Sequence, residues 1–142
     1  MESQRIVFTA PGQAELQRFQ LDETLEPGEM LVETLRTLIS PGTEGAWYSG
    51  LQRDVSGDRF QYPIYPGYCH MGQVVRVAPD VTEYQVGDWV VTGAGHASHV
   101  KVSAKRPLTF AHSDLRLPIA KVPAGLPPEQ APFAKMAEIA IT

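Results

Sequence analysis

The sequence predicts a mainly β fold that is rich in turns. Twelve prolines and twelve glycines are spread along the 142 residues instead of gathering in one segment. Between them lie short runs rich in β-branched side chains, such as 72–77 and 89–91, which fit a pleated, half-buried surface. A chain of this length holds one domain with a proper core and is too short for two full domains.

The N-terminal part is expected to be mostly strands. The expected elements are strands at 4–9, 15–21 and 30–39, a short helical turn at 45–50, and an exposed polar loop at 51–62. The run 30–39 also has leucines at helical spacing. We favour a strand there because Pro-Gly pairs bound the run on both sides.

The C-terminal part is expected to alternate strands and turns before one helix. The expected elements are strands at 72–77, 89–91 and 100–102, short segments around 108–110, a proline-rich connection at 121–128, and a helix from about Pro128 or Glu129. Proline suits the first helical turn, where its missing donor costs nothing. The helix is apolar almost all round, so it needs cover. Trp89 is expected in the core.

Composition argues against several classes of protein. The net charge is −4 without a basic block, so we expect no nucleic-acid partner. No apolar run approaches the length that crosses a bilayer, and the N-terminus does not read as a signal peptide. The single cysteine makes no internal disulfide. We therefore expect a soluble cytoplasmic protein without a membrane partner.

The most specific pattern runs from Ile64 to Val91. It begins Pro-Gly-Tyr-Cys-His-Met-Gly-Gln-Val-Val at Pro66 and closes with Gly-Asp-Trp-Val at Val90. This run resembles the pattern P-G-H-E-x-x-G-x-V-x-x-V-G-x-x-V-x-x-x-x-x-G-D-x-V of the medium-chain dehydrogenase/reductase family, in its GroES-like, zinc-type alcohol dehydrogenase-like catalytic domain. The 40–44 and 66–68 segments look like its bacteriochlorophyllide a dehydrogenase-type subgroup.

The resemblance implies a partly open β-barrel with short helices. Residues 1–125 would form the GroES-like catalytic, substrate-binding domain. Residues 126–142 would begin the linker helix that leads, in the family, to a Rossmann nucleotide-binding domain lying beyond this chain. Gly93 to Ser98 looks like part of a dinucleotide fingerprint. It lacks the third glycine and precedes β-patterned residues, so we interpret it as a β-turn and assign no cofactor-binding residue in this chain.

The resemblance breaks down at the metal ligands. Tyr68 and Cys69 stand where the family pattern has His-Glu, and Ser40 or Pro41 stands where zinc-dependent members have a cysteine. A catalytic zinc needs about three protein ligands. Cys69 and His70 are adjacent, and in an extended segment they would point to opposite faces. We therefore expect no zinc.

Two residues are candidate catalysts. Thr43-Glu44 aligns with a [ST]-D pair of the family, in which the hydroxyl relays the substrate proton; the alternative is that Thr43 and Glu44 satisfy a tight turn through local hydrogen bonds. Tyr68 has a phenol that would donate to a substrate carbonyl; the alternative is an aromatic ring that fills the place of a metal. The substrate pocket is expected to include Ser40, Trp47, Tyr48, Cys69 and His96. Cys69 is either a reactive thiol or an inert buried group.

The resemblance implies the catalytic domain of a zinc-independent NAD(P)-dependent oxidoreductase with a small-molecule substrate. Its cofactor, NAD or NADP, would bind the full-length protein, and this chain alone would be inactive. A stand-alone GroES-like binding module without catalysis is one alternative, and a quinone or enoyl reductase is another. Because the apolar C-terminal helix needs cover, we also expect a homo-oligomer.

Overall fold

The computed structural model describes residues 1–51, 61–105, 108–109 and 116–140. Its strands are β1 (Glu2–Ala10), β2 (Gln13–Gln20), β3 (Glu29–Thr37), β4 (His70–Val77), β5 (Trp89–Thr92), β6 (His99–Ser103), β7 (Leu108–Thr109), β8 (Arg116–Leu117) and β9 (Ala120–Lys121), and its helices are α1 (Thr43–Ser49) and α3 (Phe133–Ala140). The described chain is therefore mainly β, as predicted. Most of the loop predicted at 51–62 lies outside the described residues.

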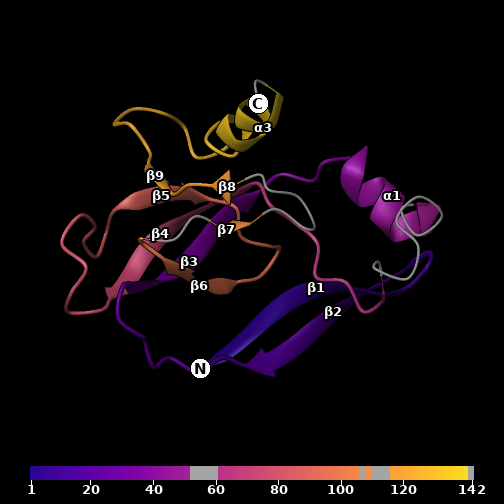
Figure 1. Cartoon of the computed structure of the whole chain (residues 1–142), viewed down its shortest axis with the longest axis horizontal. Helices are drawn as coiled ribbons and strands as arrows, with labels where there is room; N and C mark the ends of the chain where they lie inside the picture. The colour runs from indigo at the N-terminus through magenta and orange to yellow at the C-terminus, as the bar shows by residue number, and fades with distance from the viewer. Residues whose placement is uncertain (52–60, 106–107, 110–115, 141–142) are drawn as a thin grey trace.

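The largest sheet has five antiparallel strands in the order β6-β3-β4-β5-β9 (Figure 1). Strand β3 lies inside the sheet, paired with β4 on one side and β6 on the other. Its residues Met30, Leu31 and Val32 are all buried. A strand covered on both faces carries a continuous apolar run without alternation. The prediction of a strand over a helix at 30–39 is thus confirmed.

The β1–β2 hairpin lies beside this sheet as a separate pair of strands (Figure 1). It turns at Pro11-Gly12, where Gly12 takes a positive φ of 72° that favours glycine. Two isolated bridges, Arg5 to Ala97 and Phe8 to Ile64, tie β1 to the loops of the main sheet. The described sheets do not close on one another, which agrees with the predicted partly open barrel.

Two buried clusters hold these parts together. The first fills one side of the main sheet with valines and Met30 from β3, β4, β5 and β6. The second joins Phe8 of β1, Trp47 of α1, Tyr68 and Cys69, and side chains of α3 pack against it. The second cluster therefore brings the N-terminal hairpin, α1 and the C-terminal helix to one place.

The C-terminal helix starts later than predicted. The sequence placed its start at Pro128 or Glu129, but α3 begins at Phe133 and turns occupy 128–132. Pro132 has no N–H to donate to a carbonyl one turn earlier, so a helix from 128 would be interrupted there. The proline instead directly precedes the first helical residue.

Trp89 is not a core residue, contrary to the sequence-based expectation. Its side chain is 38% exposed, whereas its neighbour Val90 is fully buried. Successive side chains of a strand point to opposite faces, so burial of Val90 turns Trp89 outward. The remaining predicted strands are present, with ends that differ by a few residues.

Candidate active site

Three loops meet next to the second buried cluster. They are the α1 loop (40–44), the Pro-Gly loop (65–69) before β4, and the glycine turn (93–98) between β5 and β6. The backbone N–H of His96 donates to the Pro66 carbonyl over 2.9 Å. A Cβ at Gly67 would lie 2.7 Å from the His96 nitrogen, and one at Gly95 would lie 2.8 Å from the Pro66 oxygen. Glycine at both positions is what allows this contact.

A buried carboxylate joins two of these loops. One oxygen of Glu44, on the first turn of α1, lies 2.6 Å from Nε2 of His96. Its other oxygen accepts the backbone N–H of Ser40 over 2.6 Å. The side chain of Glu44 is 2% exposed and that of His96 is 9% exposed. The structure thus brings predicted pocket residues Ser40 and His96 together through Glu44, which sequence reasoning did not select.

The geometry fixes the tautomer of neutral His96. A carboxylate only accepts hydrogen bonds, so the hydrogen of the neutral ring must sit on Nε2. Nδ1 then carries the basic lone pair. Nδ1 has no hydrogen-bond partner among the described residues, and no side-chain nitrogen or oxygen is both sealed from solvent and without a partner there. His96 therefore has one nitrogen held by a buried carboxylate and one open to solvent.

Tyr68, Trp47 and Cys69 lie together in the second buried cluster. The rings of Trp47 and Tyr68 meet edge to face with centroids 6.2 Å apart. Tyr68 is 4% exposed and Cys69 is 1% exposed. Burial, with a further contribution from the Glu44 carboxylate, raises the pKa of Cys69 to about 12. Cys69 is accordingly a protonated, inert thiol at neutral pH, the second of the two roles left open by the sequence.

Thr43 and Tyr48 are both on α1 but face different surroundings. Thr43 is the first residue of the helix and is partly exposed. Tyr48 is near the other end, where its hydroxyl donates to the Gly12 carbonyl over 2.7 Å and its ring meets Phe8 edge to face. Tyr48 therefore braces the tip of the β1–β2 hairpin, while Thr43 stays beside Glu44 at the junction of the loops.

His70 sits inside the main sheet between two threonines, a role that the sequence did not indicate. The hydroxyl of Thr34 donates to the Ala97 carbonyl, so it accepts from Nε2 of His70. Nδ1 of the neutral ring then has only a lone pair, so it accepts from the Thr92 hydroxyl, which itself accepts the Ala94 N–H. Burial lowers the pKa of His70 to about 4, and His96 acts in the same direction. His70 is thus a neutral, structural residue that bridges Thr34 and Thr92.

Lys135 is a buried cation on α3. It is 2% exposed, its ammonium donates to the Pro118 carbonyl, and it lies 2.9 Å from the Glu138 carboxylate. Met136 and Ile139 of the same helix pack against the cluster that contains Tyr68. Phe133 points the other way and is 56% exposed. One side of α3 therefore covers the aromatic cluster, and the other side is open.

The described residues contain no group of three or more His, Cys, Asp or Glu side chains that would hold a metal ion. Cys69 and His70 contact different residues, as expected for neighbours that point to opposite faces. None of the helices in the described ranges has the length and apolar character to span a membrane.

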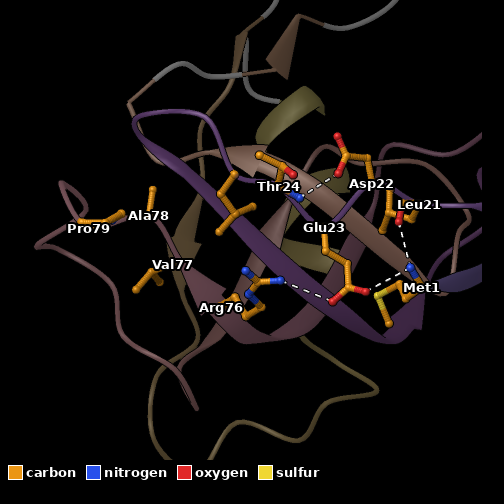
Figure 2. A pocket seen from close by; sticks show the side chains of 10 residues that line it. Met1, Leu21, Asp22, Glu23, Thr24, Arg76, Val77, Ala78 and Pro79 are labelled. Carbon is orange, nitrogen blue, oxygen red and sulfur yellow. Dashed lines mark hydrogen bonds and ion pairs between the residues drawn. The ribbon is translucent and has the colours of Figure 1, made fainter.

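A groove of about 750 Å³ lies at the N-terminus, and none of the predicted site residues lines it. Figure 2 shows the Glu23 carboxylate there between the Met1 ammonium and the Arg76 guanidinium, at 3.0 and 3.3 Å. These contacts hold the pKa of Glu23 below its usual range. The charges of Met1, Glu23 and Arg76 largely compensate one another. We therefore assign no catalytic group to this groove.

Residues 26–113 match the alcohol dehydrogenase GroES-like domain. The chain belongs to this family. It is 35% identical over 127 residues to the 2-desacetyl-2-hydroxyethyl bacteriochlorophyllide A dehydrogenase of Cereibacter sphaeroides, a match that covers 82% of the chain and 39% of the relative. It is also 39% identical over 64 residues to the protein of the same name from Rhodobacter capsulatus, covering 45% of the chain and 19% of the relative.

Solved structures of medium-chain dehydrogenases and reductases share the fold. A mutant form of enoyl thioester reductase from Candida tropicalis superposes with a TM-score of 0.67 at 20% identity, over 92% of this chain and 39% of that one. Galactitol-1-phosphate dehydrogenase from Escherichia coli gives a TM-score of 0.69 at 15% identity, over 92% and 41%. This GroES-like chain spans about two fifths of the length of these relatives.

Proposed function

We propose that this chain is the substrate-binding domain of a zinc-independent, NAD(P)-dependent dehydrogenase. The observation that carries the proposal is the match to the alcohol dehydrogenase GroES-like domain, together with the similarity to a dehydrogenase over most of the chain. In this proposal residues 1–125 form the substrate domain. Residues 126–142 begin the connection to a nucleotide-binding domain, which would supply the hydride acceptor or donor. The substrate is a small molecule with an alcohol or carbonyl group.

Thr43 and Tyr68 are the proposed contacts to the substrate oxygen. Thr43 is partly exposed beside Glu44, which supports the proposal that its hydroxyl exchanges a proton with a bound alcohol. Tyr68 stands at a metal-ligand position of the family pattern but is 4% exposed. Its phenol acts on the substrate only if the site opens beside α3. If it does not open, Tyr68 fills space, which is the alternative that its sequence position leaves open.

Zinc independence rests on the donor set at the site. Tyr68 and Cys69 replace the His-Glu pair of the family pattern, and burial keeps the Cys69 thiol protonated. Both nitrogens of the adjacent His70 contact threonine hydroxyls, so His70 does not join Cys69 in a ligand set. The polar groups that remain, Thr43 and Tyr68, polarise an oxygen by hydrogen bonding instead of by Lewis-acid catalysis.

The test is hydride transfer by the full-length gene product. Reduction of NAD and NADP is followed with a panel of alcohols. Oxidation of NADH and NADPH is followed with ketones, quinones and enoyl thioesters. We expect turnover with alcohols or ketones, less than one zinc per chain by elemental analysis, and an unchanged rate after chelation. Tyr68→Phe removes only the phenol oxygen and Thr43→Val only the hydroxyl. A loss of about 10²-fold in either variant identifies its contact.

The outcome also separates the alternatives. Turnover confined to quinones or enoyl thioesters would favour the reductase interpretation, for which the fold similarity to an enoyl thioester reductase is the motivation. Tight binding of a small molecule without turnover of any panel member would favour a non-catalytic binding module. Homo-oligomer formation and a cytoplasmic location remain predictions of the sequence.

A further inference from the structure

Alcohol oxidation releases a proton, and the hydroxyls of Thr43 and Tyr68 are not basic enough to retain it. A Thr or Tyr hydroxyl hydrogen-bonds to an oxygen and passes a proton along. Oxidation at neutral pH also needs a base whose pKa lies near the working pH. Histidine is the side chain whose ordinary pKa lies there. The proposed dehydrogenase therefore needs an available imidazole near the junction of the three loops.

Two of the three histidines in the described part of the chain are poor candidates. Both nitrogens of His70 are engaged by Thr34 and Thr92, and its pKa is lowered to about 4 by burial. His99 is on β6 at the edge of the main sheet, where its ring lies 3.3 Å from the Ser98 hydroxyl. Neither presents a free basic nitrogen at the junction of the α1 and Pro-Gly loops.

His96 meets the requirement. Its backbone is fixed to Pro66, two residues before Tyr68, and its Nε2 is fixed to Glu44, one residue after Thr43. The buried carboxylate sets the ring orientation and the tautomer, and it stabilises the imidazolium that forms on protonation. The solvent-open Nδ1 is then the basic atom. The titratable and charged groups around the ring are Glu44 of α1, which contacts it, His70 of β4, whose pKa it helps to lower, and Arg5 of β1, which lines the same small cavity.

We propose that His96 is the general acid–base residue of the dehydrogenase and that Glu44 positions it. When the substrate is oxidised, the alcohol O–H bond breaks and its proton bonds to Nδ1 of His96. The C–H bond breaks with its electron pair, which leaves as hydride to the nicotinamide ring, and the carbonyl double bond forms. In the reverse direction the imidazolium returns the proton to the oxygen. This inference rests on the proposed function above.

The test uses the full-length gene product and two variants at the pair. His96→Gln keeps an N–H that can donate to Glu44 but has no titratable nitrogen, so we expect kcat/KM to fall about 10²- to 10⁴-fold. Glu44→Gln removes the charge that stabilises the imidazolium. We expect the pH profile of kcat/KM for alcohol oxidation to differ from that of wild type, a change that a merely structural role of Glu44 would not produce. His99→Gln is the matched control and should stay within about twofold of wild type.

A second readout is independent of turnover. In ¹⁵N-histidine NMR spectra we expect the neutral His96 ring of the wild type to be the Nε2–H tautomer, because Nε2 faces a carboxylate that only accepts. Dispersed spectra of both variants show that they are folded.

The outcomes are distinguishable. A wild-type enzyme that transfers hydride, with an unchanged rate and pH profile in His96→Gln, overturns this inference and leaves the proposed function standing. A neutral His96 ring that carries its hydrogen on Nδ1 also overturns it. If the wild-type protein transfers no hydride with any substrate of the panel, both proposals are overturned.

Discussion

At the scale of single residues, the buried side chain of His70 makes the stability of the main sheet depend on pH. Its ring fills a buried position where both nitrogens have hydroxyl partners, Thr34 on one side and Thr92 on the other. Each hydroxyl has a second partner in the glycine turn, so one proton arrangement satisfies the whole set. Protonation would place a charge in a buried site near His96, and burial first and His96 second lower the pKa of His70.

This arrangement predicts acid sensitivity. The pKa of His70 falls from 6.5 to about 4 on folding, so between these values the unfolded chain binds a proton that the folded chain excludes. The free energy of unfolding should therefore be highest above pH 6.5. It should decrease toward pH 4 by up to roughly 3 kcal/mol. Urea denaturation of the chain at pH 4.5, 5.5, 6.5 and 7.5 measures this slope.

The control variants isolate His70 from other titrating groups. His70→Gln should be less stable at pH 7.5 but should lose most of the pH dependence above 4.5, whereas His99→Gln should keep the wild-type slope. The carboxylates of Asp80 and Asp88 have pKa values held below the usual range, so they act mainly below this window. Equal slopes in wild type and His70→Gln would show that His70 is not the residue responsible.

Sequence reasoning at this scale selected several residues that the fold brings near one another, but not the contacts between them. Ser40, Trp47, Tyr68, Cys69 and His96 were selected from the resemblance or the local turn, and all lie around the junction of the loops. The contact between His96 and Glu44 spans 52 positions, and no local pattern indicates such a pairing. The neutral role of His70 likewise depends on hydroxyls from two other strands, which only the sheet register brings to it.

At the scale of elements, Gly72 sets the distance between β3 and β4. A Cβ there would lie 2.4 Å from the Glu33 carbonyl oxygen and 2.6 Å from a methyl group of Val32. Gly72 pairs with Thr34, between two register shifts of this strand pair. The close contact is with backbone of the neighbouring strand, so a side chain at this position has to separate the two strands.

We therefore predict that Gly72→Ala destabilises the chain by about 2–3 kcal/mol, because overpacking moves backbone atoms of a central strand. Gly45→Ala is the matched control. Gly45 lies in α1, where an added Cβ would have no atom within 4 Å, and alanine has the higher helix propensity. That variant should be about 0.5–1 kcal/mol more stable than wild type.

Thermal and urea unfolding of both variants measures the difference. If Gly72→Ala is as stable as wild type, the two strands do not approach as closely as the structure has them. The position of this glycine in a strand was not explained by the sequence. The run 72–77 predicts a strand, but only the neighbouring strand shows why its first residue has no side chain. The start of α3 was wrong for a related reason, because Pro132 limited the helix more than the apolar pattern indicated.

At the scale of the whole molecule, the fold was predictable and the assembly of the site was not. The family pattern at 64–91 identifies the scaffold, since its glycines and valines specify turns and buried strands. The site depends on three loops that come from separate parts of the chain and on α3, which reaches back over the aromatic cluster. These contacts are set by packing between distant segments. The sequence pattern therefore identifies the scaffold but does not indicate how side chains from distant segments pair.

The arrangement of strands around the glycine turn at 93–98 predicts that a dinucleotide does not bind there. The glycine turn at 93–98 is followed by strand β6, which begins at His99, and not by a helix. A pyrophosphate is held where a glycine-rich turn opens a helix and the N-terminal N–H groups meet the anion. The described part of the chain lacks this arrangement after β5, in agreement with its interpretation as a β-turn.

We therefore expect the 142-residue chain to bind NADH and NADPH only weakly, with a Kd above about 1 mM, and the full-length gene product to bind one of them in the micromolar range. Quenching of tryptophan fluorescence and isothermal titration measure both proteins under the same conditions. Adenosine monophosphate serves as a control for weak anion binding. Micromolar binding of a dinucleotide by the chain itself would contradict the prediction. It would place cofactor contacts within the GroES-like domain, so that the glycine turn would have to be reconsidered as part of them.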